Sequence, residues 1–189
     1  MSIILGIDAS QSVASCAIGN DDGVIASAIM EKPIENFPKL IRKILSDSNK
    51  SIQEIDEIVV CIGPGSQMGT RTAVVTGNAL ALALNKPISG VLSTDAAAVA
   101  SCNKTQTVAV SAGRRRWFVR DYIYENEKIM ADGDVDLVDE VPENVSPSFY
   151  NLDSSDNTAI NCAEGALLVA INQRHLIVQN MLSEVRAYD

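Results

Sequence analysis

A carboxylate and a hydroxyl close the first predicted strand of this 189-residue chain. Asp8 and Ser10 follow the apolar run at residues 3–7, and a hairpin is predicted to begin directly after them. Oxygen atoms at such a strand end can hold the magnesium ion of a bound phosphate. The same two side chains can instead cap the turn, and the three-residue pattern alone favours this capping role.

A glycine-rich segment provides the second set of residues with possible chemistry. It runs from residue 63 to residue 69, between a predicted strand at 57–62 and a predicted helix at 70–84. Converging backbone N–H groups and a helix N-terminus are suited to anions, and these candidate phosphate ligands are Gly63, Gly65, Ser66, Gly69 and Arg71. The segment lacks the Lys-Ser/Thr ending of a Walker loop, and it could equally be a tight turn that brings strand and helix together.

Other catalytic chemistries find little support in the sequence. The single histidine, His175, has no partner at a metal-ligand spacing, which argues against a zinc site and a histidine-based triad. Four widely spaced cysteines predict reduced, buried thiols: Cys16, Cys61, Cys102 and Cys162. We therefore expect no catalytic residue and no metal ligand in this chain.

Charge and hydropathy limit the possible partners. The net charge of −9 opposes direct binding to nucleic acid. The basic run 114–116 precedes an aromatic pair, and together they could stack on RNA. The favoured interpretation is that these arginines are solvated at the entrance to a strand. No apolar stretch is long enough to span a membrane, and the N-terminus has no basic region or cleavage site of a signal peptide. We expect a cytoplasmic protein without a membrane partner.

The elements that must position these residues form an α/β pattern with two lobes. The first lobe, residues 1–102, is predicted to contain strands at 3–9, 12–19, 24–30, 57–62 and 87–91, and helices at 34–46, 70–84 and 94–101. The second lobe, residues 103–189, is predicted to contain strands at 106–112, 117–124 and 127–131, an acidic turn-rich stretch at 132–158, and a helix over 159–182 that breaks near 172–173.

Two predicted helices have unusual faces. The 34–46 helix is amphipathic, with apolar residues at helical spacing. The 69–84 helix is rich in small residues, and Gly77 in its middle costs about 1 kcal/mol relative to alanine, which close approach of another backbone can offset. Either the protein's own sheet or a partner could supply that contact.

Three segments together resemble the TsaB (YeaZ) family, which belongs to the bacterial machinery for N6-threonylcarbamoyladenosine (t6A) in tRNA. They are the strand pattern at 4–10, the block from Gly63 through Gly69 to Arg71, and the stretch 80–91; the strand-turn-strand at 110–119 also fits. The resemblance extends over roughly residues 3–131 and implies a two-lobed actin/sugar-kinase-like fold, each lobe of βββαβα type, with the second lobe reduced.

The same resemblance implies a non-catalytic scaffold subunit of the t6A transferase complex. It would dimerise with and activate a TsaD-like catalytic subunit, with a TsaE-like ATPase joining the pair, and it would form a homodimer in isolation. The partner subunits would bind ATP and metal, and the chain would contact tRNA only as part of the complex. The implied contact residues lie on the two helices of the first lobe: Phe37, Leu40, Ile41, Ile44, Thr70, Val74, Gly77 and Ala81.

Two alternatives remain open. A small-molecule kinase or ATPase of the same superfamily would use Asp8 for the metal and the 63–69 segment for a phosphate. A regulatory homodimer would instead pair the 69–84 helix with its own copy.

Overall fold

The computed structural model describes residues 2–11, 13–31, 37–101, 105–113, 116–126, 128–140, 145 and 162–177. A five-stranded sheet forms the first lobe, in the order β3-β2-β1-β4-β5. Its strands are β1 (Ile4–Asp8), β2 (Val13–Asn20), β3 (Gly23–Glu31), β4 (Glu57–Cys61) and β5 (Ile88–Val91). The first three are antiparallel, whereas β4 pairs with β1 and β5 with β4 in parallel.

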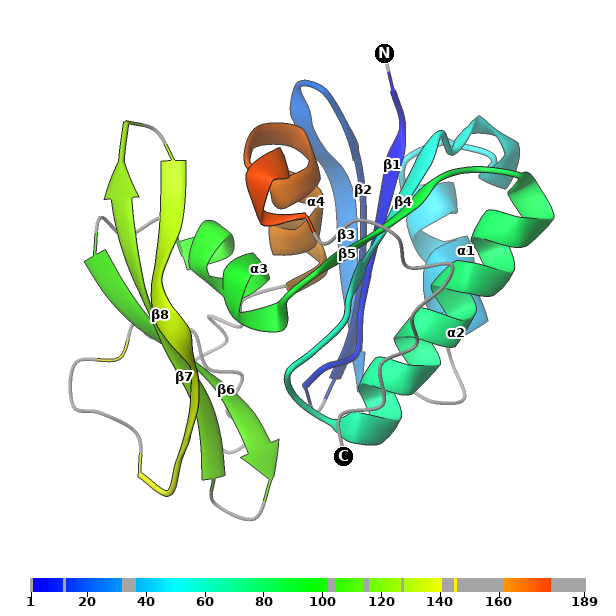
Figure 1. The fold of residues 1–189 in the computed structure, drawn as a ribbon. Coiled ribbons are helices and arrows are strands. Elements are labelled where there is room, and N and C mark those ends of the chain that lie inside the picture. The colour runs from blue at the N-terminus through cyan, green and yellow to red at the C-terminus, as the bar shows by residue number, and fades with distance from the viewer. Residues whose placement is uncertain are drawn as a thin grey trace.

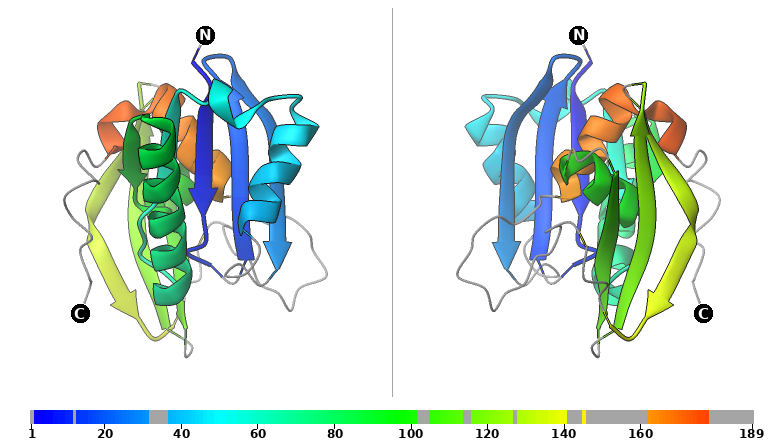
Figure 2. Two further views of the ribbon diagram at one scale, coloured as in Figure 1. Left: turned by 90° about the vertical axis from the view of Figure 1, so that its right-hand side faces the viewer. Right: turned by 90° about the vertical axis from the view of Figure 1, so that its left-hand side faces the viewer.

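Helices cover both faces of this sheet (Figure 1). On one face lie α1 (Phe37–Asp47) and α2 (Gln67–Leu84), which stand side by side in front of the strands in the left view of Figure 2. On the other face lie α3 (Ser93–Ser101) and α4 (Cys162–Asn172). The predicted helix at 159–182 is thus confirmed over 162–172, and a short 3-10 turn, η3 (Arg174–Leu176), follows the predicted break.

A three-stranded antiparallel sheet, in the order β6-β7-β8, packs beyond α3 and forms the second lobe (Figure 1). Its strands are β6 (Thr105–Gly113), β7 (Arg116–Glu125) and β8 (Lys128–Val138). The prediction of acidic turns from residue 132 onward is wrong up to Val138, because Asp132, Asp134 and Asp136 lie exposed along an edge strand that needs no second buried face. The remainder of that stretch lies outside the described residues, except 139, 140 and 145.

Helix α4 follows the strands of the second lobe in the sequence, but it packs on the first sheet. A side chain at Gly6 of β1 would meet the carbonyl oxygen of Ala163 at 2.5 Å, and one at Gly165 would meet the carbonyl of Ala96 at 2.0 Å. Backbone therefore packs directly on backbone at both contacts. Residues 162–172, which follow the predicted boundary at residues 102 and 103, thus cover the sheet built by residues 4–91.

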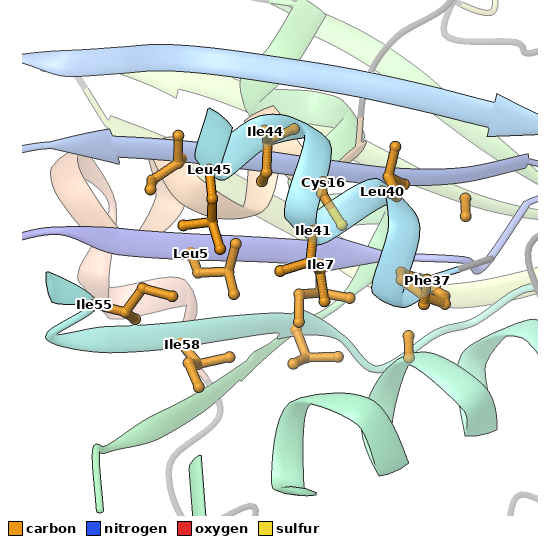
Figure 3. Close-up of a cluster of buried hydrophobic side chains, with 14 of the residues drawn as sticks. Leu5, Ile7, Cys16, Phe37, Leu40, Ile41, Ile44, Leu45, Ile55 and Ile58 are labelled. Atoms are coloured by element: carbon orange, nitrogen blue, oxygen red, sulfur yellow. The ribbon is translucent and has the colours of Figure 1, made fainter. Parts of the chain in front are cut away.

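Two apolar clusters fill the spaces between these layers. One lies between the first sheet and α1, where Leu5, Ile7, Leu40 and Ile44 are fully buried (Figure 3). The other lies between the two sheets and includes Ile4, Val59, Leu167 and residues of β6 and β7. Burial of this much aliphatic surface is the main stabilising contribution to the fold.

A buried carboxyl joins α3 to the second sheet. Asp95 accepts a hydrogen bond from the hydroxyl of Tyr122 and one of 3.1 Å from Nη1 of Arg120. Arg120 also donates through Nε to the carbonyl oxygen of Gly133 on β8, at 3.0 Å. Burial raises the pKa of Asp95, and both donors oppose that rise because they stabilise the ionised form.

Among the described residues, no helix is both long and apolar enough to cross a membrane.

Candidate functional site

Asp8 and Ser10 lie at the C-terminal end of β1, buried beneath the segment that precedes α2. Asp8 is 1 % exposed, and its Oδ1 accepts a 2.9 Å hydrogen bond from the backbone N–H of Ser10. Burial raises the pKa of Asp8, while contacts with Ser10 and Cys61 lower it by less. The carboxylate therefore closes its own turn, which is the capping role that the three-residue pattern favours.

The glycine-rich segment packs directly on that turn. The N–H of Ser66 donates to the carbonyl oxygen of Ser10 at 2.6 Å. A side chain at Gly65 would meet the same Ser10 oxygen at 2.1 Å, and one at Gly69 would meet the carbonyl oxygen of Ala9 at 1.9 Å. Gly65 also has a φ of +153°, a conformation that other residues rarely adopt. Glycine is required here because two backbone segments touch.

The N-terminus of α2 uses several of its own donors internally. Oγ of Ser66 accepts the N–H of Gly69 at 3.3 Å, and the carbonyl oxygen of Ser66 accepts the N–H of Thr70 at 2.8 Å. Ser66 is thus the N-cap of α2, and its side chain satisfies one of the free donors of the first helical turn, the N–H of Gly69. The segment thus has the geometry of the tight turn that the sequence left as an alternative to a phosphate loop.

Of the seven predicted phosphate ligands, six converge at this point and one does not. Asp8, Ser10, Gly63, Gly65, Ser66 and Gly69 surround the contact between the β1 end and the turn. Arg71 is exposed on α2, beyond the turn. Two buried hydroxyls lie beside the turn: Ser10 Oγ interacts with the Asp8 carboxyl, and Thr70 Oγ1 has no hydrogen-bond partner within the described part of the chain.

Buried thiols surround the same strand ends. Cys16, Cys61 and Cys162 are free and buried, as predicted, whereas Cys102 lies outside the described residues. Burial is the largest cause that raises the pKa of all three thiols, and the nearby Asp8 carboxylate adds to it. Within the described part of the chain, no three histidine, cysteine or acidic side chains are grouped to hold a metal ion.

Helix α1 directs its apolar side chains into the protein's own core. The four predicted contact residues on this helix are between 0 and 4 % exposed: Phe37, Leu40, Ile41 and Ile44. Figure 3 shows them pointing onto β1 and β2. Their assignment to a partner surface is corrected, because the apolar stripe of an amphipathic helix is the side that its own sheet covers.

Helix α2 also directs its predicted contact residues inward. Gly77 and Ala81 are buried, and a side chain at Gly77 would meet Cγ2 of Val60 at 2.5 Å and Cδ1 of Ile88 at 3.1 Å. Thr70 and Val74 are half-buried, and Val74 packs against the core of the first sheet. The close contact at Gly77 is thus made by side chains of the chain's own β4 and β5, not by another backbone as predicted.

The outward face of α2 carries large apolar side chains instead. Met68, Val75 and Leu82 are 65, 64 and 81 % exposed. They recur every seven residues and therefore form one stripe along the 18-residue helix. We call these three residues the α2 stripe. The signal that could have identified it is the four-residue spacing of Gly69, Ala73, Gly77 and Ala81, which marks the opposite face as the one closest to the sheet.

Comparison with solved structures identifies the class of fold. YeaZ from Pseudomonas aeruginosa superimposes with a TM-score of 0.77 over 100% of both chains, at 18% sequence identity. A second structure, described as similar to the peptidase YeaZ from the same organism, gives a TM-score of 0.78, with 18% identity and 100% and 99% coverage. The chain therefore shares the fold of these structures, which agrees with the α/β fold class predicted from the sequence.

Comparison of sequences identifies the family. A family model described as "TsaD: tRNA N6-adenosine threonylcarbamoyltransferase" matches residues 10–159, which is more than half of the chain, and the chain belongs to that family. Its resemblance to TsaB is confirmed by the Bacillus subtilis tRNA threonylcarbamoyladenosine biosynthesis protein TsaB, which is 30% identical over 145 residues. That match covers 72% of this chain and 63% of the relative.

Catalytic relatives match over a shorter stretch. The tRNA N6-adenosine threonylcarbamoyltransferase of Zymomonas mobilis is 33% identical over 107 residues, which are 47% of this chain and 30% of that protein. The chain therefore spans less than two thirds of the length of these curated relatives.

Proposed function

We propose that this chain is a non-catalytic scaffold subunit in the biosynthesis of threonylcarbamoyladenosine in tRNA. In this role it dimerises with a TsaD-like catalytic subunit through the outward face of α2 and activates it, and a TsaE-like ATPase joins the pair. Without that partner the chain forms a homodimer through the same face. The family membership and the similarity to TsaB support the pathway.

The observation that carries the proposed contact is the α2 stripe. Three large apolar side chains, each at least 64 % exposed and aligned on one regular helix, form the kind of surface that binds an apolar partner face. The neighbouring exposed positions of α2 include Ala79 and Ala83, which allow a second helix to approach closely. The inward face of the same helix is already used by the first sheet.

The closed turn at the start of α2 supports a non-catalytic role. Two of its backbone N–H groups, those of Ser66 and Gly69, donate to the Ser10 carbonyl and the Ser66 side chain, so a phosphate that used them would have to displace contacts within the chain. In this role ATP and metal are bound by the partner subunits. The net charge of −9 likewise supports contact with tRNA only through the complex.

The test is light scattering on mixtures of this chain with the TsaD-like protein of the same organism. The wild-type chain is expected to give a one-to-one complex, and Leu82→Glu to weaken it at least tenfold because the substitution buries a charge in the contact. Leu137→Glu is the matched control, since Leu137 is an exposed leucine (49 %) on β8 of the second sheet. Equal binding by Leu82→Glu and the wild type would reject the proposed surface.

A kinase or ATPase activity is the second candidate, favoured by the buried hydroxyl of Thr70 beside the turn, which has no hydrogen-bond partner among the described residues. Calorimetric titration of the isolated chain with magnesium and ATP separates the two functions. Binding that Ser10→Ala abolishes would favour the kinase, and no heat of binding would favour the scaffold.

A further inference from the structure

Strand β3 presents an unpaired apolar edge. It ends the five-stranded sheet, and within the described residues its only neighbouring strand is β2. Helix α1 packs on one face of β3 and α4 on the other, so none of the helices that the structure describes covers its outer margin (Figure 2). Val24, Ile25 and Ile29 are 39, 43 and 38 % exposed there. Long apolar edges of this kind pair readily with another strand.

The other described strand edges carry the usual protection against such pairing. β5 has only four residues, and β6 forms a bridge from Thr107 to Val145. β8 exposes Asp132, Asp134 and Asp136, so pairing with a second copy of itself would bring many negative charges together. β3 has none of these features, since residues 23–30 include no charged side chain and no proline.

The sequence of β3 is self-complementary for antiparallel pairing. Residues 25–29 read Ile-Ala-Ser-Ala-Ile in both directions. With a two-fold axis through Ser27, Ile25 of one copy lies opposite Ile29 of the other, and Ala26 lies opposite Ala28. Both isoleucine pairs then stand on one face of the sheet, and cross-strand pairs of β-branched residues stabilise sheets. An interface of this type is isologous, using the same patch on both copies.

We propose that β3 is the docking surface for β3 of a second copy of this chain. The two five-stranded sheets then join into one continuous sheet of ten strands, five from each copy. Charge limits where two copies can meet: a chain with a net charge of −9 repels its copy over most of its surface, whereas residues 23–30 carry no charged side chain. Glu164 of α4, which accepts a hydrogen bond from the Ser27 hydroxyl, is the acidic group that the contact must accommodate beside the strand. This contact is separate from the proposed α2 contact, because α2 packs over β4, β1 and β5 and leaves β3 free.

Cross-linking between two different cysteine variants tests the register. Ile25→Cys and Ile29→Cys are made separately, mixed and oxidised; the described native cysteines are buried. The mixture is expected to give a disulfide-linked dimer. Each variant alone is expected to give much less, because identical positions lie four residues out of register, about 13 Å apart, beyond the roughly 7 Å limit of a disulfide. The wild-type chain under the same oxidant is the control. A mixture that cross-links no better than either variant alone would overturn the proposal.

Sedimentation analysis gives an independent measurement. It is performed in a Leu82→Glu background, so that association through α2 does not contribute. The double substitution Ile25→Lys/Ile29→Lys places two positive charges in each cross-strand pair and is expected to weaken dimerisation at least tenfold. Met130→Lys is the matched control, because Met130 is also 43 % exposed on an edge strand. Circular dichroism confirms that each variant is folded. A monomeric Leu82→Glu chain at concentrations on the order of 100 µM would overturn the proposal.

Discussion

Helices α1 and α2 lie on the same face of the first sheet, yet they distribute their side chains in opposite ways. α1 buries its large apolar residues, such as Leu40 and Ile44, and exposes Lys39, Arg42 and Lys43. α2 buries glycine and alanine and exposes Met68, Val75 and Leu82. The difference shows that the buried face of a helix depends on its distance from the sheet. A helix that packs closely needs small residues inward, and its large apolar residues remain available for another contact.

The largest expected effect comes from a matched pair of leucine truncations. Leu40→Ala removes a fully buried side chain of α1 and is expected to lower the free energy of unfolding by about 2–5 kcal/mol, because it leaves a cavity in the core. Leu82→Ala removes a side chain that is 81 % exposed on α2 and is expected to change stability by at most about 0.5 kcal/mol. Urea denaturation of both variants measures the difference; similar losses would mean that α2 does not face outward as described.

A smaller loss is expected where α2 begins. Gly69→Ala places a methyl group against the Ala9 carbonyl oxygen, and the strain is expected to cost about 1–3 kcal/mol. A gain in helix propensity opposes this loss, since alanine is otherwise the better helix former. Thermal unfolding monitored by circular dichroism gives the net result. The control is Ala79→Gly on the exposed face, which is expected to cost about 1 kcal/mol through propensity alone. A stabilised Gly69→Ala variant would contradict the close backbone contact.

The smallest effect has the opposite sign. The folded pKa of Asp8 is raised by burial, so above the ordinary pKa of an aspartate the folded chain binds more protons than the unfolded chain. Stability contributed by Asp8 is therefore lost as the pH rises through the folded pKa. Asp8→Asn keeps an acceptor for the Ser10 N–H and removes the buried charge. We expect its thermal midpoint at neutral pH to exceed that of the wild type by a few degrees.

The comparison at acid pH completes that test. The advantage of Asp8→Asn is expected to shrink as the pH falls through the raised folded pKa of Asp8, because the wild-type carboxyl then becomes protonated in the folded chain. A variant that is less stable than the wild type at neutral pH would show that the ionised carboxylate has a favourable partner at this site.

Local pattern predicted the elements of this protein better than it predicted their faces. Strand and helix positions up to residue 101 follow from apolar periodicity and turn residues, and the structure agrees closely. The turn at 63–69 was found because glycine and proline mark it in the sequence. Whether it binds a phosphate or a neighbouring backbone depends on the Ala9 and Ser10 carbonyl oxygens, whose position is set by tertiary packing.

The faces of α2 do not follow from its apolar residues, because Val74 and Val75 have the same local signal in either direction. The four-residue spacing of its small residues does mark the inward face, and the close approach of Gly77 to Val60 confirms that assignment. The length of the last strand, β8, was also predicted too short. Asp132 and Asp136 resemble turn residues in isolation, but pairing with β7 holds them in an extended edge strand.

The direct contact between Gly6 and Ala163 has a consequence for synthesis on the ribosome. The first sheet can form soon after residue 91 is made, but the face that α4 covers stays bare while the following 70 or so residues are added. At about 5–20 residues per second this interval lasts several seconds. During that time Ile4 and Val59, which are fully buried in the finished protein, lack part of their cover. The nascent chain is then a client for chaperones that bind apolar surfaces, and truncation before residue 162 would leave it permanently in that state.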